Sequence, residues 1–298
     1  MIDAIVRSMR PKQWTKNGVV FAGLIFSRSL GQPQMVLRAV AAVAIFCLLS
    51  GSVYLINDIK DIDKDRRHPT KCKRPLPSGA LSVAQAWGAA IVLAAGSLAA
   101  AFALNPKFGA LAAGYVALVS AYSFGLKNVV VVDVFAIALG FVLRAVAGVE
   151  ALALEGSSIE LSPWLLICTF LLATFLALAK RRNEISSFEK EGKVAAAHRA
   201  VLDEYTLPLL DQMTAAVSSA TIVAYALYTF DERTVQSFGS AALAATTPFV
   251  MYGIFRYMYL VHRRQMGGNP ETIFLTDRGI LTCVLLWILS AGAIIYLV

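Results

Sequence analysis

The chain has 298 residues and a formal net charge of +8, with 58% hydrophobic and 15% charged residues and a mean hydropathy of +0.66. Soluble domains are about a quarter charged, so this chain has too few charged side chains to cover a water-soluble fold of its size. Its apolar residues also fall into long uncharged blocks, which predicts an all-α, polytopic membrane protein.

Apolar blocks long enough to cross a bilayer recur along the chain. A transmembrane helix needs about 20 largely apolar residues. Seven blocks are built on uncharged runs, the first block is anchored by Trp14 and Lys16, and the fifth is apolar apart from Asp133 and Arg144. We therefore expect one integral membrane domain over residues 1–298. Its nine predicted spans lie near 13–29, 34–57, 82–104, 107–125, 128–149, 162–180, 206–229, 241–260 and 278–297.

Basic residues are concentrated on one side of the predicted membrane. Of the 27 Lys and Arg residues, 22 lie in the N-terminal flank and in the connections 58–81, 125–129, 180–205 and 256–278. Cytoplasmic loops are enriched in Lys and Arg, so we place the N-terminus and these connections in the cytoplasm. Residues 1–12 alternate apolar and basic side chains, which predicts a short helix in the headgroup layer. Because the bases flank membrane spans, the net charge does not indicate nucleic-acid binding.

An acidic stripe follows the second span. If that helix continues, the helical period places an amide, three carboxylates and a tyrosine on one face: Asn57, Asp58, Asp61, Asp65 and Tyr54. Like charges on one helical face repel, and the C-terminal end of a helix adds to that cost. A Mg²⁺ ion removes both penalties and prefers such oxygen ligands. The alternative is a solvated charge run that neighbouring Lys and Arg side chains neutralise.

A basic cluster occupies the equivalent place after the sixth span. The helical period puts Lys180, Arg181 and Glu184 on one side of that helix. The first cluster offers carboxylates and the second offers cations, so a metal-bound polyphosphate with a second phosphate group would use both. The alternative interpretation is ordinary enrichment of bases at a cytoplasmic helix end.

Other polar residues accompany the two clusters. Lys71 and Arg74 stand at a Pro- and Gly-containing turn, from which they can reach an anion. Within the fifth span, Asp133 and Arg144 share a face but are too far apart to pair. Arg144 therefore needs another anion, for which we prefer a bound phosphate over a structural carboxylate or backbone carbonyls. Asp277 and Arg278, before the last span, either cap a helix or contact substrate.

The motif Asn57-Asp58-x-x-Asp61-x-x-x-Asp65, followed by an Arg-Pro pair and a Gly turn, resembles the first aspartate-rich motif of the UbiA superfamily of intramembrane prenyltransferases. Nine spans agree with that family, and the resemblance covers essentially the whole chain. Lys180 and Arg181 stand where most members carry a second aspartate-rich motif. Three further runs of residues accompany this departure: 65–71, 122–127 and 143–148. Together, the four features are similar to those of the decaprenyl-phosphate phosphoribosyltransferase branch of the superfamily.

This resemblance implies an enzyme with a UbiA-like bundle in the bacterial inner membrane and an active site that faces the cytoplasm. It implies Mg²⁺-dependent transfer of 5-phosphoribose from 5-phosphoribosyl 1-diphosphate to a polyprenyl phosphate, with release of diphosphate, in the synthesis of cell-wall arabinan precursors. The expected metal ligands are Asn57, Asp58, Asp61 and Asp65, and the three carboxylates are also the expected catalytic residues. The expected donor-binding residues are Lys16, Tyr54, Lys71, Arg74, Tyr122, Lys127 and Arg144. Lys180, Arg181 and Glu184 are expected at the lipid phosphate or at the donor 5-phosphate.

Two other functions remain open at this point. A UbiA-type prenyltransferase that joins a polyprenyl diphosphate to an aromatic or other acceptor would share the acidic stripe, but it should carry carboxylates where Lys180 and Arg181 stand. A transporter of an anionic metabolite or lipid would place charges near the bilayer midplane and break helices toward both sides, whereas the charge clusters here gather on one side. The sequence leaves open whether the chain forms a homo-oligomer.

Overall fold

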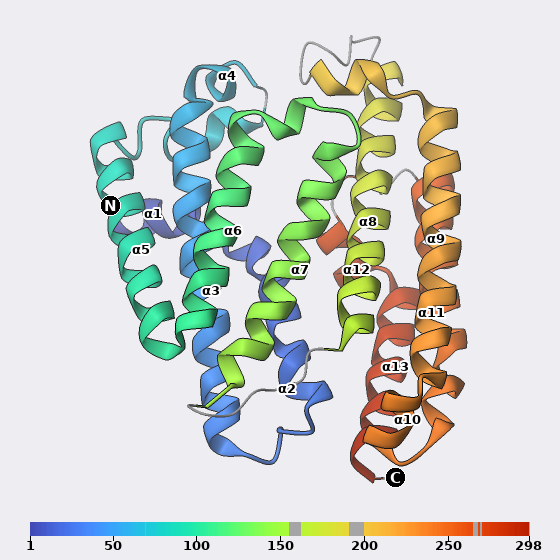
Figure 1. Cartoon of the computed structure of the whole chain (residues 1–298). Helices are drawn as coiled ribbons and strands as arrows, with labels where there is room; N and C mark the ends of the chain where they lie inside the picture. The colour runs from blue at the N-terminus through green and yellow to red at the C-terminus, as the bar shows by residue number, and fades with distance from the viewer. Residues whose placement is uncertain (69, 155–161, 191–199, 265–267, 269, 298) are drawn as a thin grey trace. The chain divides into compact units, whose positions relative to one another are not determined.

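The structure is a computed structural model that describes residues 1–68, 70–154, 162–190, 200–264, 268 and 270–297. Within these residues all regular secondary structure is helical (Figure 1), which confirms the predicted all-α class. The elements are α1 (Ile2–Ser8), η1 (Pro11–Phe21), α2 (Ala22–Phe26), α3 (Pro33–Lys60), α4 (Ile62–Arg66), η2 (Lys71–Lys73), α5 (Val83–Leu104), α6 (Pro106–Phe124), η3 (Leu126–Asn128), α7 (Val132–Leu152), α8 (Pro163–Lys190), η5 (Ala200–Glu204), α9 (Leu207–Phe230), α10 (Glu232–Phe238), η6 (Ala241–Thr246), α11 (Thr247–Arg264), α12 (Pro270–Thr276) and α13 (Arg278–Leu297). Those labelled η are 3₁₀ helices.

Seven of the described helices are long and apolar enough to cross a membrane: α3, α5, α6, α7, α8, α9 and α13. A further pair, α10 and the segment Ala241–Arg264, passes the same test together but is bent by 107°. The described residues therefore support seven spans, or eight if the bent pair forms one span. The prediction of nine spans and the predicted orientation of the N-terminus are not confirmed.

The segment 13–29, predicted as the first span, folds differently. It forms the 3₁₀ helix η1 and the short helix α2, and left-handed residues lie on either side of these two helices at Arg10 (φ 54°) and Arg28 (φ 56°). The first half of this segment is polar, and Asn17 is buried and donates to the Cys47 sulfur at 3.3 Å. A buried polar side chain needs such a partner, so η1 packs against α3 rather than forming a regular spanning helix.

Met1–Phe124 and Leu143–Leu161 form the first of two compact units, and we call it unit 1. In it, α3 lies between α5 and η1, and α6 follows α5 (Figure 1). Three aromatic side chains pack together in its core. The centroid of the Phe46 ring lies 5.8 Å from that of Phe108 and 5.4 Å from that of Tyr115. The second half of α7 approaches η1 so closely that a Cβ atom on Gly148 would lie 2.1 Å from the Val20 carbonyl oxygen, so only glycine fits there.

Arg38 joins three chain segments within unit 1. Its guanidinium donates to the carbonyl oxygens of Ala151 (2.8 Å), Leu104 (2.9 Å) and Ala153 (3.1 Å). The last carbonyls of a helix lack partners within the helix, and these three lie at or just beyond the ends of α5 and α7. Arg38 therefore satisfies the C-terminal ends of two apolar helices with one charged side chain.

Gly125–Val142 and Ser162–Val298 form the second compact unit, unit 2. Its α8 packs along α9, and α11 packs along α13 (Figure 1). Helix α8 continues to Lys190, so the predicted loop 180–205 begins as helix, and residues 191–199 of that loop lie outside the described part of the chain. The charged residues at 180–184 are thus held on a rigid helix and not on a loop.

Candidate active site

The acidic stripe is not one uninterrupted helix, as the sequence analysis assumed. Helix α3 ends at Lys60, Asp61 takes φ −98° and ψ 12°, and α4 begins at Ile62. Helical hydrogen bonds nevertheless cross the break: the Asp61 N–H donates to the Asn57 carbonyl at 3.0 Å, and the Asp65 N–H donates to the Asp61 carbonyl at 2.8 Å. The spacing of one turn between these residues therefore survives the break.

Asp58 and Asp65 bind basic side chains. They are only 2% and 4% exposed, and burying a carboxylate requires a compensating partner. Arg74 lies between them, with its Nη1 2.6 Å from Asp65 Oδ2 and 3.2 Å from Asp58 Oδ1. Arg10 forms a second, short ion pair with Asp58, and the Lys71 ammonium lies 3.8 Å from Asp65. Two predicted donor-binding bases, Lys71 and Arg74, are thus held at the acidic stripe by its own carboxylates.

Asn57 and Asp61 differ from these two carboxylates. Both are partly buried, and their side chains make no hydrogen bond or ion pair with the described residues. Mg²⁺ is typically bound by one or two protein carboxylates together with water and substrate phosphates, so an amide and a carboxylate one turn apart fit such an ion. The described residues contain no group of three or more His, Cys, Asp or Glu arranged for a metal. The predicted four-residue ligand set is therefore not preassembled, because Asp58 and Asp65 bind bases instead.

The remaining predicted donor-binding residues are distributed over both units. Lys16 on η1, Tyr54 on α3 and Tyr122 on α6 are partly exposed within unit 1, and Lys127 is partly exposed on η3 in unit 2. The Arg10 guanidinium lies 4.8 Å from the centroid of the Tyr54 ring. Arg10 has no place in the sequence motif, and no local pattern connects it with an aspartate 48 residues later.

Arg144 binds neutral groups inside unit 1. It is 6% exposed, and its guanidinium donates to Asn17 Oδ1 at 2.9 Å and to the Tyr115 hydroxyl at 2.6 Å, with the Tyr115 ring centroid 4.4 Å away. An amide oxygen, a hydroxyl and an aromatic face each stabilise a buried cation. The preferred phosphate partner for Arg144 stays a prediction.

The basic cluster lies inside unit 2 around Arg181. This side chain is 2% exposed, its Nε lies 3.1 Å from Asp133 Oδ2, and its Nη1 forms a short ion pair with Glu184. Asp133 is fully buried and also accepts a hydrogen bond from the Tyr205 hydroxyl at 2.8 Å. Asp133 and Arg144 thus have separate partners, as their spacing predicted. Arg181 points into the unit, whereas the neighbouring Lys180 is partly exposed.

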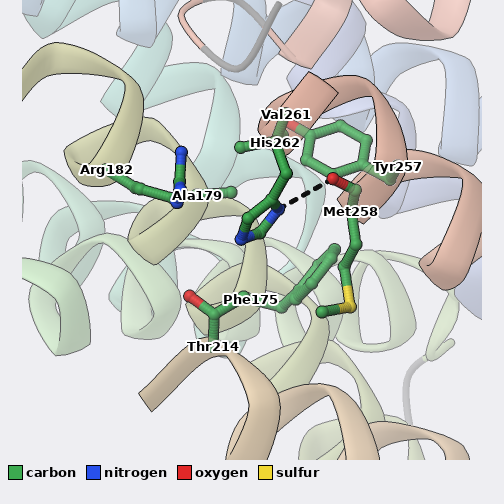
Figure 2. A pocket seen from close by; sticks show the side chains of 8 residues that line it. All are labelled: Phe175, Ala179, Arg182, Thr214, Tyr257, Met258, Val261 and His262. Atoms are coloured by element: carbon green, nitrogen blue, oxygen red, sulfur yellow. Dashed lines mark hydrogen bonds between the residues drawn. The ribbon is translucent and has the colours of Figure 1, made fainter. Parts of the chain in front are cut away.

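A second charged group in unit 2 lies beside a small apolar hollow. Arg182 Nε donates to Asp211 Oδ1 at 2.5 Å, and His262 Nε2 lies 3.2 Å from the same oxygen. The His262 ring is hydrogen-bonded to the Met258 carbonyl oxygen at 2.8 Å, and Figure 2 shows both residues beside Phe175 in the lining of this hollow. The hollow has no room for a water molecule, so it is too small to bind a reactant.

Asp277 caps a helix, which is one of the two roles left open by the sequence. Its Oδ1 accepts the Ile280 N–H at the start of α13 at 2.9 Å, and its Oδ2 lies 2.9 Å from Arg256 Nη2. The hydrogen bond from Arg256, followed by the one from Ile280, holds the pKa of Asp277 below its ordinary value. Asp277 therefore caps α13 and holds Arg256 beside it.

Known proteins resemble this chain over nearly its whole length. It is 33% identical to decaprenyl-phosphate phosphoribosyltransferase of Mycobacterium tuberculosis, across 98% of this chain and 94% of the relative. It is 31% identical to the protein of the same name from Corynebacterium glutamicum, across 100% and 88% of the two chains. The solved structure of a UbiA homolog from Archaeoglobus fulgidus bound to GPP and Mg²⁺ has a similar fold, with a TM-score of 0.70, 22% identity, and coverage of 98% and 99%.

A family model described as the UbiA prenyltransferase family matches residues 18–277. The match includes the acidic stripe, the Arg181 cluster and the first eight of the nine predicted spans, apart from the first residues of the N-terminal one. It agrees with the resemblance carried by the motif that begins at Asn57 and with the helical fold of the solved relative. The chain therefore belongs to the UbiA prenyltransferase family and is a membrane-embedded transferase.

Proposed function

We propose that this enzyme transfers 5-phosphoribose from 5-phosphoribosyl 1-diphosphate to a polyprenyl phosphate of the decaprenyl type and releases diphosphate. The observation that carries the proposal is the 33% identity, over nearly full length, to a protein named for that activity. The product would serve as a precursor for cell-wall arabinan. The distribution of bases in the sequence supports an active site that faces the cytoplasm of a bacterial cell, within one integral membrane domain.

Asn57 and Asp61 are the residues that we propose to hold a magnesium ion. Their uncommitted oxygens support this assignment, and so does the Mg²⁺ bound in the solved relative from Archaeoglobus fulgidus. A bound Mg²⁺ supplies charge neutralisation to a diphosphate and so makes it a better leaving group. Asp58 and Asp65 would complete the metal site when the donor's phosphates attract Arg74 and Lys71 away from them. Until then, these carboxylates keep both bases beside the place where the diphosphate would bind.

The proposed chemistry needs no general base. An oxygen of the lipid phosphate, already anionic near neutral pH, attacks the anomeric carbon of the ribose, and the bond from that carbon to diphosphate breaks. Transfer at an anomeric carbon passes through an oxocarbenium-like state, and direct attack predicts inversion at this carbon. The side chains then have to bind two anions, orient them and stabilise the departing charge.

Basic residues carry most of that binding in the proposal. Lys71 and Arg74 would bind the diphosphate, and Lys16, Tyr54, Tyr122, Lys127 and Arg144 are proposed for the donor's other polar groups. Lys180 would meet the lipid phosphate or the donor 5-phosphate. Arg181 and Glu184 were predicted for the same anion, but their ion pair inside unit 2 supports a role in holding this part of α8 in place.

A comparison of donors tests this proposal against ordinary prenyl transfer. Purified enzyme in lipid nanodiscs should label decaprenyl phosphate when given ribose-labelled phosphoribosyl diphosphate and Mg²⁺, and chelation by EDTA should abolish the labelling. The matched reaction offers a polyprenyl diphosphate and an aromatic acceptor. A prenylated acceptor without a phosphoribosylated lipid would replace the proposed function with the alternative one.

A further inference from the structure

Val131 has a backbone conformation that its side chain disfavours. Its φ is 67°, in the left-handed region, which β-branched residues rarely adopt because the branched Cβ crowds the backbone. Val131 lies in the short turn between η3 and α7, and η3 carries Lys127, a proposed phosphate-binding residue. Such a conformation persists only where surrounding contacts enforce it, so some contact must hold this turn.

The hydroxyl of Tyr205 supplies that contact. The Val131 N–H donates to the Tyr205 oxygen at 2.7 Å, and the same hydroxyl donates its own proton to Asp133 Oδ1 at 2.8 Å. Asp133 in turn pairs with Arg181. One hydroxyl therefore links the strained turn to the ion pair on α8, and all of these residues belong to unit 2.

The environment of Tyr205 keeps its hydroxyl protonated and fixed. Its side chain is 3% exposed in a core with Val134, Leu178 and Leu202, and the preceding 3₁₀ helix η5 packs against η3. Burial, together with the hydrogen bond to the Asp133 carboxylate, raises the pKa of Tyr205 to about 12. The hydroxyl can therefore donate to Asp133 at any physiological pH.

We propose that Tyr205 is a positioning residue for the transfer reaction, because its hydroxyl fixes the turn that follows the Lys127-bearing helix η3 and the Asp133–Arg181 pair in one geometry. The inference rests on the proposed function in one respect, namely that Lys127 binds a phosphate of the donor. Tyr205 acts through its neighbours and need not touch either reactant. A tyrosine in this place has no signature in the sequence, since its partners lie more than 70 residues before it.

The substitution Tyr205→Phe tests this role. It keeps the buried ring and removes both hydrogen bonds, so the turn should relax from the left-handed conformation. We expect the donor KM to rise about tenfold with kcat little changed, because the lost positioning affects ground state and transition state alike. Hydrogen exchange of the backbone amides in 126–133, measured without substrates, should become faster, because the Val131 N–H loses its acceptor.

Rescue separates positioning from a general loss of packing. Adding Val131→Gly to Tyr205→Phe should restore the donor KM to within about twofold, since glycine adopts positive φ without steric cost. Val131→Ala on the same background should not restore it, because alanine keeps the steric penalty. Tyr225→Phe is the matched control, since that hydroxyl also bonds to two partners, Thr246 and Trp287, within unit 2; its donor KM should stay normal.

Two results would overturn the inference. One is an unchanged donor KM and unchanged amide exchange in Tyr205→Phe, and the other is equal rescue by glycine and alanine at position 131. If Tyr205→Phe does not fold, amide hydrogen exchange is measured instead in Val131→Gly, which keeps the native tyrosine. The backbone amide at position 131 must then remain protected from exchange, as in the native enzyme. An enzyme that transfers no phosphoribose at all would defeat the proposed function, while amide exchange would still decide whether Tyr205 holds the turn.

Discussion

Asp61→Ala should lower phosphoribosyl transfer by on the order of a thousandfold, the largest effect expected of any single substitution here. Stabilisation of the leaving group by a bound metal is worth several kcal/mol, and about 1.4 kcal/mol corresponds to tenfold in rate. The Asp61 side chain makes no hydrogen bond or ion pair with the described residues. The thermal stability of the purified variant should therefore remain that of the native enzyme, and only the rate and its Mg²⁺ dependence should change.

Asp63→Ala is the matched control for this experiment. Asp63 lies two residues away, has a side chain that is 80% exposed, and pairs only weakly with Arg66 at 3.4 Å. Exposed pairs of this kind contribute little, so the rate should stay within about twofold of the native enzyme. Equal rates for the Asp61 and Asp63 variants would show that Asp61 does not hold the metal.

Arg181→Met should destabilise the protein by about 3–5 kcal/mol, since breaking a buried ion pair leaves an uncompensated charge. The substitution leaves the fully buried Asp133 with its Tyr205 hydrogen bond but without its cation. The loss can be measured as a lower unfolding midpoint in detergent. Removing both charges in Asp133→Leu with Arg181→Met should cost less than the arginine substitution alone, because the fully buried carboxylate is then gone as well. Glu184, which is 27% exposed, loses its partner equally in both variants.

Arg182→Met supplies the comparison for the Arg181 substitution. Arg182 pairs with Asp211, whose side chain is 39% exposed, and partly solvated pairs contribute up to about 1 kcal/mol. The two arginines are neighbours on α8, so a general intolerance of methionine in this part of the helix would lower both midpoints equally. Equal losses would contradict the buried pair as the cause.

The sequence predicts the membrane-spanning helices well where apolar side chains continue for a full span. Uncharged runs correctly located α3, α5, α6, α8, α9 and α13, because a bilayer requires length and apolarity and little else. The span predicted at 13–29 is not confirmed, because this segment forms the 3₁₀ helix η1 and the short helix α2, with Asn17 buried against α3. The prediction also failed to detect the 107° bend between α10 and the segment Ala241–Arg264, where Gly239 takes φ 73°.

The candidate site was predictable as a set of residue types but not as a set of contacts. Helical spacing correctly grouped the acidic residues at 57–65, since that spacing is local. It could not show that Asp58 and Asp65 bind Arg10 and Arg74, because those partners approach through the fold. The same holds for Tyr205 and Asp133 in unit 2, which are 72 residues apart.

The most direct test of the account is a double-label experiment on the native enzyme. The donor carries ¹⁴C in its ribose and ³²P in the terminal phosphate of its diphosphate, and the acceptor is decaprenyl phosphate. We predict that ¹⁴C enters the lipid and ³²P is released as diphosphate in equal molar amounts, only when Mg²⁺ is present. Lipid that carries both labels, or no ¹⁴C-labelled lipid at all, would contradict phosphoribosyl transfer as the reaction of this protein.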